Sequence, residues 1–229
     1  MIVQSCQQLA EQIVSQVSQQ EKFLVVGGDH SSAIGTWSGV RHAIAPQKKI
    51  GLLWVDAHMD SHTFNTSPSG MIHGMPLAAL LGYGDARLTH LFGYQTKLDL
   101  GKLCLVGVRS FEPEEAQLLE RLNVKVFFME EIQTRGLQAV MQEALAIVQG
   151  ANGGFGISID MDAFDPSEIP AVGSPVHQGI DIYAFIHTLE SICRHPGFLG
   201  AELAEFNPEL DHNEASAKLI CRLIDAIFR

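Results

Sequence analysis

The sequence has little positive charge and no long apolar segment. Only 15 of its 229 residues are Lys or Arg against 26 Asp or Glu, which gives a formal net charge of −11. An acidic protein repels phosphate backbones and anionic lipid surfaces, so nucleic acid and membrane are poor partners. No apolar run reaches the length of a membrane span, and the N-terminus lacks the pattern of a signal peptide. A cationic small molecule fits this charge better.

Cysteine is scarce and shows no ligand spacing. The four cysteines, Cys6, Cys104, Cys193 and Cys221, form no C-x-x-C pair. Cys104 stands in an apolar run, which is the usual place of a buried free thiol. We therefore expect reduced, non-ligating cysteines and a cytoplasmic protein.

Linkers, repeats and low-complexity tracts are also absent. Hydrophobic residues make up 46% of the chain and charged residues 18%, which is ordinary for a globular protein and argues against disorder. The length matches one large domain, so we predict a single domain over residues 1–229.

Short apolar runs alternate with segments of helical periodicity. Such runs are typical of strands buried on both faces, as in a parallel sheet. They are Phe23–Val26, Ile50–Val55, Leu103–Val108, Val124–Phe128, Phe155–Ile159 and Phe198–Leu203. The helical segments are 2–20, 33–44, 74–82, 114–122, 137–149, 181–193 and 212–228. This alternation predicts an α/β fold with three α/β/α layers and a mainly parallel sheet.

Three residues mark expected helix boundaries. Gly136 is expected to interrupt the helical segment before Leu137. Asp181 is expected to cap the helix that follows it, because its side chain can accept hydrogen bonds from the first turn. Pro113 suits the first turn of another helix, since that position needs no backbone N–H donor.

Acids and histidines follow four of the predicted strands, at the points where the strands end. The segments are GGDHS (27–31), DAHMD (56–60), DMD (160–162) and EFNP (205–208). In open α/β sheets, ligands bind at the carboxyl edge of the strands. Alternate side chains of an extended segment point the same way. We therefore expect Asp56, His58 and Asp60 to converge from one strand end, and Asp160 and Asp162 from another.

Clustered carboxylates raise one another's pKa unless a cation lies between them, so these side chains favour a metal site. The predicted ligands are His30, Asp56, His58, Asp60, Asp160 and Asp162. Oxygen ligands with some imidazole suit Mn²⁺, with Fe²⁺, Co²⁺ and Zn²⁺ as alternatives. Six ligands exceed the need of one ion, so two ions about 3.5–4 Å apart are expected. Each motif alone could be a helix cap or a turn, and only the three together favour metal.

The motifs and their order resemble the arginase/agmatinase family of ureohydrolases. The matching stretches are GGDHSSAIGT (27–36), DAHMD (56–60), TSPSGMIHGMP (66–76), SIDMDAFDP (158–166), PAVGSP (170–175) and AELAEFNPELD (201–211). The resemblance covers nearly all of the chain from Val25 onward, and the segment around Ser69 is closer to arginase than to agmatinase. The chain is short at its N-terminus relative to the family, which would expose a sheet edge. This edge, and the family's trimers and hexamers, imply a homo-oligomer.

The resemblance also implies residue roles. One Mn²⁺ would be bound by His30, Asp56, Asp60 and Asp160, and a second by Asp56, His58, Asp160 and Asp162. The implied reaction is hydrolysis of a guanidino compound to urea and an amine. Asp60 would hydrogen bond to the attacking hydroxide, His73 would carry a proton to the leaving amine, and Glu205 would pair with the guanidinium group. Further implied substrate contacts are Ser69, Glu112, Ser174 and His62.

Some positions depart from the arginase pattern. His62 and Met71 replace two asparagines whose amides help to hold the α-carboxylate of arginine in the family, and a thioether is no amide donor. Glu112 replaces an aspartate near the α-amino group, with Ser174 for Thr and Gln178 for Gly as milder changes.

These departures leave the substrate open. L-arginine, cleaved to L-ornithine, is our first choice, and agmatine, guanidino acids and formiminoglutamate are the alternatives within the enzyme class. A different class of function is a metal-bound but inactive family member that acts in assembly. Intact His73 and Glu205 argue against that reading, because an inactive site has no chemical reason to keep them.

Overall fold

The structure is a computed structural model that describes residues 1–93 and 96–229. Its strands are β1 (Phe23–Val26), β2 (Ile50–Val55), β3 (Leu98–Val108), β4 (Lys125–Phe128), β5 (Phe155–Asp160) and β6 (Phe198–Ala204). Its α-helices are α1 (Ile2–Ser18), α2 (Ser32–Ala43), α3 (Pro76–Leu80), α4 (Ala86–Thr89), α5 (Pro113–Arg121), α6 (Met129–Arg135), α7 (Leu137–Val148), α8 (Ile182–Cys193) and α9 (Ala215–Phe228). Within the described ranges, no helix has both the length and the apolar character needed to cross a bilayer.

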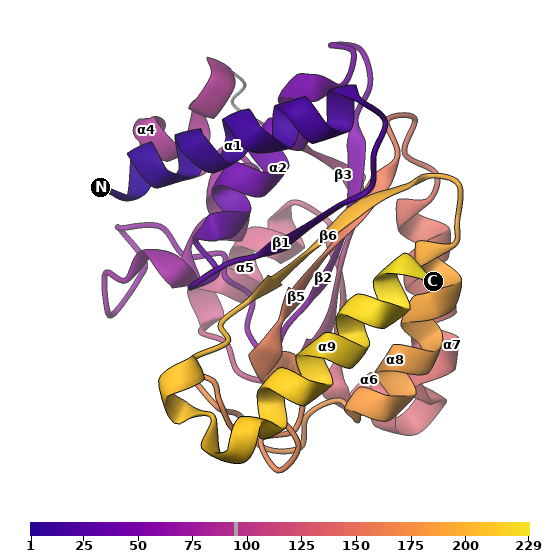
Figure 1. The fold of residues 1–229 in the computed structure, drawn as a ribbon. Coiled ribbons are helices and arrows are strands. Elements are labelled where there is room, and N and C mark those ends of the chain that lie inside the picture. The colour runs from indigo at the N-terminus through magenta and orange to yellow at the C-terminus, as the bar shows by residue number, and fades with distance from the viewer. Residues whose placement is uncertain (94–95) are drawn as a thin grey trace.

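The six strands form one sheet in the order β1-β6-β5-β2-β3-β4, and all its pairings are parallel. Parallel neighbours need crossover connections, which place helices on the faces of the sheet. Figure 1 shows α1, α2 and α5 on one side of the strands and α6 to α9 on the other. The α/β fold with a parallel sheet is therefore confirmed, and all six predicted strands are present.

Burial of both sheet faces explains the continuous apolar runs of β2, β5 and β6, whereas the edge strands β1 and β4 are partly exposed. Every residue of β2 is buried. Leu53 and Val55 pack in the core beneath α6 to α9, whereas Leu52 and Trp54 pack in the core beneath α1 and α2. Because alternate residues face opposite layers of helices, neither face of the strand can be polar.

The three expected helix boundaries are confirmed. Gly136 has a φ of 83° between α6 and α7, a conformation that glycine adopts without steric strain. The Asp181 side chain accepts a hydrogen bond from the backbone N–H of Ala184. Pro113 is the first residue of α5, where Glu112 and Glu115 form a reciprocal capping box.

Several predicted boundaries were wrong. Segment 74–82 is a 3-10 turn (Ile72–Gly74) followed by the short helix α3, and Gly82 has a φ of 89° outside it. Segment 212–228 begins as a 3-10 turn, and α9 starts only at Ala215 because residues 213 and 214 have positive φ values. Strand β3 begins at Leu98 rather than Leu103, and helix α4 was not predicted.

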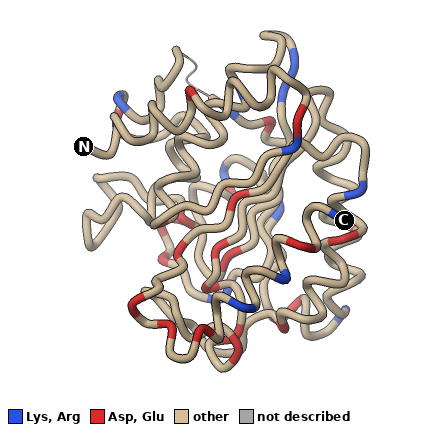
Figure 2. The backbone as a smooth tube through the Cα atoms, in the orientation of Figure 1, with Lys and Arg blue, Asp and Glu red and all other residues tan. Residues whose placement is uncertain are grey.

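The strands that carry the polar motifs are neighbours. β1, β6, β5 and β2 lie side by side in the sheet order, although they are far apart in sequence. Figure 2 shows acidic residues, in red, where strands of this group end. Because the pairings are parallel, the four carboxyl ends meet at one edge of the sheet, as the sequence predicted.

Candidate metal centre

His30 is placed by the tight turn between β1 and α2. A Cβ at Gly27 would lie 2.4 Å from Ser32 Oγ, so a larger residue would force the Ser32 hydroxyl to move. Asp29 Oδ1 accepts the backbone N–H of Ser31 at 3.0 Å and holds the turn. The His30 ring is fully buried and stacks on the Trp54 indole, with 4.1 Å between ring centroids.

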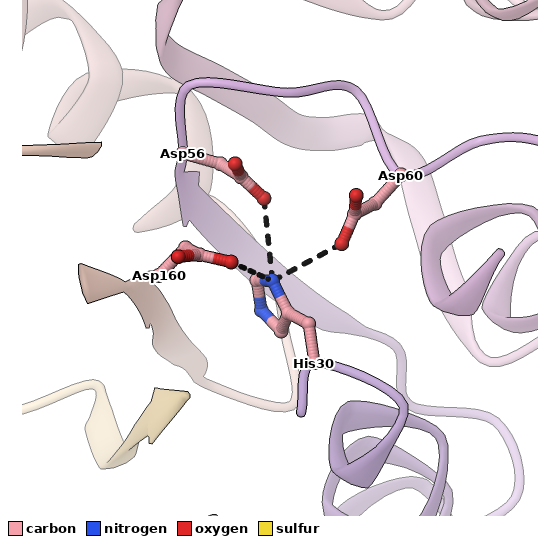
Figure 3. A group of neighbouring side chains, drawn as sticks. All are labelled: His30, Asp56, Asp60 and Asp160. Carbon is pink, nitrogen blue, oxygen red and sulfur yellow. Dashed lines mark ion pairs between the residues drawn. The ribbon is translucent and has the colours of Figure 1, made fainter. Parts of the chain in front are cut away.

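The Nδ1 atom of His30 faces three carboxylates from two strand ends (Figure 3). It lies 3.2 Å from Asp56 Oδ2, 3.1 Å from Asp60 Oδ2 and 3.0 Å from Asp160 Oδ2. All four side chains are buried. Asp60 has a φ of 48°, the kind of backbone strain that concentrates at functional sites. Asp56 and Asp160 thus point into a shared space, as the sequence required.

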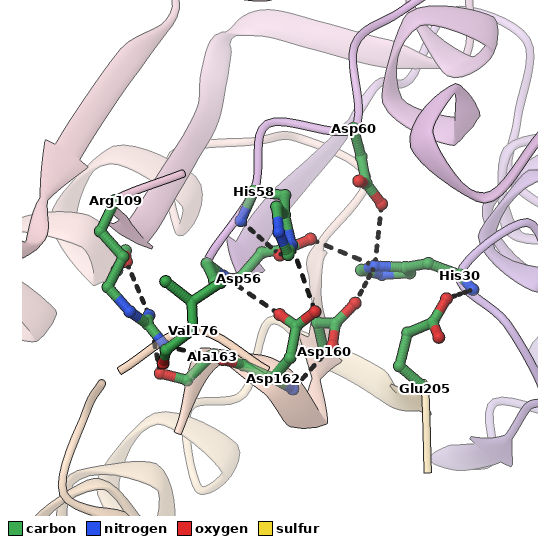
Figure 4. Close-up of polar contacts among 12 residues, drawn as sticks. His30, Asp56, His58, Asp60, Arg109, Asp160, Asp162, Ala163, Val176 and Glu205 are labelled. Carbon is green, nitrogen blue, oxygen red and sulfur yellow. Dashed lines mark hydrogen bonds and ion pairs between the residues drawn. The ribbon is translucent and has the colours of Figure 1, made fainter. Parts of the chain in front are cut away.

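A second group adjoins the first through Asp56 (Figure 4). Asp56 Oδ1 lies 3.5 Å from His58 Nδ1, and His58 Nδ1 lies 3.2 Å from Asp162 Oδ2. In each group the candidate ligand atoms lie within 4.8 Å of one another. The two oxygens of Asp56 therefore face two histidines, so this carboxylate belongs to both groups. All six predicted ligands come together.

The expected reason for this convergence was wrong in part. The strands end at Val55 and Asp160 and do not continue as extended chain. Instead, Asp56 Oδ1 accepts the backbone N–H of His58 at 2.7 Å, and Asp160 Oδ1 accepts that of Asp162 at 2.8 Å. These side-chain turns fold the second acid or histidine back beside the first.

Burial and mutual repulsion perturb the protonation of the cluster. Burial and the Asp56 charge raise the pKa of Asp60 to about 8. Burial, Asp162 and Asp56 raise the pKa of Asp160. Burial opposes the His58 imidazolium, yet Asp162 and Asp56 raise its pKa to about 12. Without a metal, the carboxylates can stay together only by holding protons on themselves or on the histidines.

The residues present fit a pair of divalent cations. Across the described residues, His30 Nδ1 and Asp60 Oδ2 are buried without a hydrogen-bond partner, although they lie 3.1 Å apart. Buried polar atoms without partners are rare in native proteins and call for an ion or a water. The donors are carboxylate oxygens and imidazole nitrogens with no thiolate, a set that suits divalent first-row metals.

Arg109 stabilises the segment that carries Asp162 through hydrogen bonds to backbone carbonyls. Its guanidinium donates to the backbone carbonyls of Asp162 at 2.8 Å and Val176 at 2.7 Å, and to those of Gly107 and Ala163 at 3.1 Å (Figure 4). One planar group therefore ties the end of β3 to the DMD turn and to the loop beyond it. No motif in the sequence indicated this role.

Lysine at position 109 is expected to lower the free energy of unfolding. Its single ammonium group cannot reach all the carbonyls that Arg109 binds, and losing two such bonds costs about 2–4 kcal/mol. Urea denaturation measures the change. Arg194→Lys is the control, because Arg194 is exposed and forms an ion pair with Glu190 at 3.8 Å that lysine can keep, so its effect should stay within about 0.5 kcal/mol. Equal stability of the two variants would contradict the role assigned to Arg109.

A cavity of about 90 Å³ lies beside the two groups of ligands. It is lined by five of the predicted catalytic or substrate residues besides Asp60, namely His62, His73, Glu112, Ser174 and Glu205. Within residues 1–93 and 96–229, no Lys or Arg lines this cavity, so its charge favours a cationic group. Ser69 does not line it. Ser69 lies in an exposed loop, where its hydroxyl accepts the backbone N–H of Met71 at 3.2 Å.

Glu205 and His73 face each other across this cavity. Glu205 Oε1 accepts the backbone N–H of His30 at 2.9 Å, which fixes the carboxylate beside the first ligand group. His73 Nδ1 lies 3.6 Å from the same oxygen, and 36% of the His73 side chain is exposed. Burial raises the pKa of Glu205. A partly exposed histidine thus lies beside a partly buried carboxylate.

His62 is held by two glutamates at the mouth of the cavity. Its Nε2 lies 3.1 Å from Glu112 Oε2 and 3.5 Å from Glu115 Oε2, and its Nδ1 lies 3.1 Å from Thr66 Oγ1. The hydrogen bond from His62 lowers the pKa of Glu112. Glu115 was missed by the sequence reasoning, and only its place one helical turn after Glu112 could have suggested it.

Three buried residues behind the ligands were also missed. Trp54 Nε1 donates to Asp56 Oδ2 at 2.9 Å. Ser158 Oγ lies 3.0 Å from His30 Nε2, and Glu202 accepts from Ser158 at 3.1 Å. Ser158 pairs in register with both Trp54 and Glu202 across three strands. A serine and a glutamate inside otherwise apolar strands were the available signal.

Comparison with known proteins agrees with this geometry. A model of the Arginase family matches residues 2–229. The chain belongs to the Arginase family. As a member, it is a hydrolase acting on a guanidino C–N bond. The match begins at residue 2, so the family likeness extends well before Val25, where the motifs first revealed it.

Individual arginases show how close the likeness is. The chain is 40% identical to the arginase of Brevibacillus brevis over 228 residues, which is 99% of this chain and 75% of that one. The arginase of Bacillus caldovelox superposes with a TM-score of 0.94 at 36% identity, covering 99% of this chain and 75% of that one. The arginase of Entamoeba histolytica, solved in complex with L-ornithine, superposes with a TM-score of 0.91 at 28% identity, covering 99% and 76%.

Proposed function

We propose that the protein is a binuclear manganese amidinohydrolase that converts L-arginine to L-ornithine and urea. The observation that carries the proposal is the shared carboxylate of Asp56, whose two oxygens face His30 and His58 beside a cavity lined by His73 and Glu205. Two ligand groups that share a carboxylate suit a pair of cations about 3.5–4 Å apart.

The six clustered residues would hold the two ions. His30, Asp56, Asp60 and Asp160 would bind one, and Asp56, His58, Asp160 and Asp162 the other. Mn²⁺ is proposed because oxygen donors outnumber imidazoles and no thiolate is present. When bound, such a pair supplies a water whose pKa is low enough for it to lose a proton near neutral pH.

The chain's own residues then orient the substrate and move protons. Glu205 Oε1 is occupied by the backbone N–H of His30, which leaves Oε2 to accept from the guanidinium. The oxygen of water adds to the guanidino carbon, and the bond from that carbon to the alkyl nitrogen breaks. Asp60 accepts a hydrogen bond from the attacking oxygen. His73, partly exposed, donates a proton to the leaving nitrogen and recovers it from solvent.

Arginine is the first choice of substrate for two reasons. Relatives that are 38–40% identical to this chain are named arginases. The Entamoeba arginase was solved with L-ornithine, which is the amine left when arginine loses urea. Agmatine, guanidino acids and formiminoglutamate stay as alternative substrates. The reason is that His62 and Met71 stand where the family's asparagine amides help to hold the α-carboxylate of arginine, and neither side chain is an amide.

A panel of guanidino compounds tests the proposal. Purified protein loaded with Mn²⁺ is assayed for urea or formamide release from L-arginine, agmatine, guanidino acids and formiminoglutamate, and its metal content is measured in the same sample. His30→Ala, which removes one ligand, is the inactive control. Urea from arginine above that control supports the proposal. If product is released only from another compound, that compound replaces arginine as the proposed substrate. Metal-loaded protein as inert as His30→Ala supports the alternative function in assembly.

Mn²⁺ is expected to raise the melting temperature more at pH 8 than at pH 6. The Asp60 carboxyl keeps its proton up to about pH 8 in the folded chain, against an ordinary pKa of 3.8. The folded state therefore binds more protons than the unfolded state, and the stability of the metal-free protein falls as pH rises between these values. Metal binding needs the deprotonated carboxylates and displaces their protons.

Scanning fluorimetry with and without Mn²⁺ at the two pH values measures this difference. The matched control is Mg²⁺ at the same concentration, which corrects for general cation effects. A Mn²⁺ shift that is equal at both pH values, or larger at pH 6, would contradict proton displacement from the cluster.

Domain organisation, assembly and location are proposals of the same kind. We propose a single domain over residues 1–229, supported by one continuous sheet. A homo-oligomer, a trimer or hexamer, is proposed, and sedimentation of the purified protein tests it. A cytoplasmic location is proposed because Cys6, Cys104 and Cys193 are buried free thiols.

A further inference from the structure

Glu202 is a buried carboxylate behind the candidate metal centre that the proposed reaction does not use. It lies in the middle of β6 and is 0% exposed. Its Oε1 accepts from Ser32 Oγ at 2.8 Å and Thr36 Oγ1 at 2.9 Å, and its Oε2 accepts from Ser158 Oγ at 3.1 Å. Burying a carboxylate without a cationic partner is unfavourable, so three hydroxyl donors at this point are a built arrangement.

The hydroxyl of Ser158 links this carboxylate to His30. Ser158 Oγ lies 3.0 Å from His30 Nε2 and 3.1 Å from Glu202 Oε2. Ser158 Oγ donates its one proton to Glu202 Oε2. The same oxygen is therefore left to accept a hydrogen bond from His30 Nε2–H.

This direction of hydrogen bonding determines which ring nitrogen of His30 is available. With the proton on Nε2, the lone pair of Nδ1 points at Asp56, Asp60 and Asp160. The ring cannot turn over easily, because it is buried and stacked on Trp54 at 15° between ring planes. A histidine that binds metal needs its other nitrogen held in this way.

We infer that Glu202 is a positioning residue that acts through Ser158 to hold His30 in the tautomer whose Nδ1 can bind a cation. The inference rests on the proposed function, because it assigns Glu202 and Ser158 to the ion that His30 would bind. It differs from a purely structural role for Glu202, which would stabilise the fold without affecting one ion more than the other.

The test measures Mn²⁺ uptake rather than urea release. The electron paramagnetic resonance signal of free Mn²⁺, followed during titration of metal-free protein at one pH, gives the number of bound ions and their dissociation constants. Ser158→Ala removes the acceptor for Nε2–H with a small change in volume. Glu202→Met removes the carboxylate, so that Ser158 can donate to Nε2 instead. Thr36→Val is the matched control, because Thr36 contacts only Oε1 of the same carboxylate.

Wild type and Thr36→Val are expected to bind two ions with the same two constants. Ser158→Ala and Glu202→Met are expected to weaken one ion by about 10–100-fold and leave the other unchanged. If Glu202→Met fails to fold, as circular dichroism would show, Ser158→Ala alone decides. Two unweakened ions in Ser158→Ala overturn the inference and leave the proposed function standing. Wild type that binds no Mn²⁺ overturns both.

Discussion

Asparagine at position 56 is expected to abolish binding of both ions and to lower urea release by about 10³-fold or more. Asp56 is the carboxylate shared by the two ligand groups. Its Oδ1 accepts the backbone N–H of His58 at 2.7 Å, and its Oδ2 accepts Trp54 Nε1 at 2.9 Å. Whichever way the asparagine amide is turned, its NH₂ group faces one of these donors. The variant thus loses the charge and also places two donors against each other.

Metal content and urea release of Asp56→Asn are measured together, with folding checked by circular dichroism. Asp181→Asn is the matched control. Asp181 caps α8 from an exposed position, and asparagine is an equally good N-cap, so neither activity nor metal content should change. A folded Asp56→Asn protein that still binds two ions would show that Asp56 is not the shared ligand.

Glutamine at position 205 is expected to lower kcat/KM by about 10²-fold or more while both ions stay bound. The Oε1 of Glu205 accepts the backbone N–H of His30, so an amide in the same orientation turns its NH₂ group toward the cavity. The guanidinium group, itself a hydrogen-bond donor, would then meet an NH₂ donor in place of a carboxylate acceptor. The loss should therefore fall on substrate orientation and not on metal affinity.

Steady-state kinetics and metal analysis of Glu205→Gln separate these two effects. Glu209→Gln, on the exposed turn just beyond, is the control and should match wild type. Loss of an ion from Glu205→Gln would assign Glu205 to the metal centre instead. Unchanged kinetics would remove it from the site altogether.

The convergence of the six side chains was predictable because the motifs that carry them are local. GGDHS and DAHMD directly follow β1 and β2, DMD begins at the last residue of β5, and the carboxyl ends of parallel strands share one edge. The adjacency of β1, β6, β5 and β2 was not predictable in the same way. Strand order depends on which crossover connections pack best, and no single segment of the sequence specifies it.

The residues behind the ligands escaped prediction for a different reason. Strand register places Trp54, Ser158 and Glu202 next to one another on three adjacent strands. Register is a property of the assembled sheet and cannot be seen in one segment. In the sequence, each of these residues lies within an apolar run of the kind that is typical of the hydrophobic core. Arg109 escaped for a similar reason, since its carbonyl partners at Asp162 and Val176 lie more than 50 residues away.

The substrate side of the site was only partly predictable. His62, Glu112 and Ser174 line the cavity as the family resemblance implied, whereas Ser69 does not. The loop around Ser69 is shaped by its own short contacts, such as Ser67 Oγ accepting the N–H of Gly70 at 3.0 Å. Loops of this kind carry specificity, and their conformation depends on contacts that a motif does not encode.

Anomalous diffraction at the manganese edge, from crystals of Mn²⁺-loaded protein, would locate the ions themselves. We expect two peaks about 3.5–4 Å apart, one within bonding distance of His30 Nδ1 and the other of His58 Nδ1, with Asp56 between them. A single peak, or peaks away from Asp56, would contradict a binuclear centre built from these six side chains.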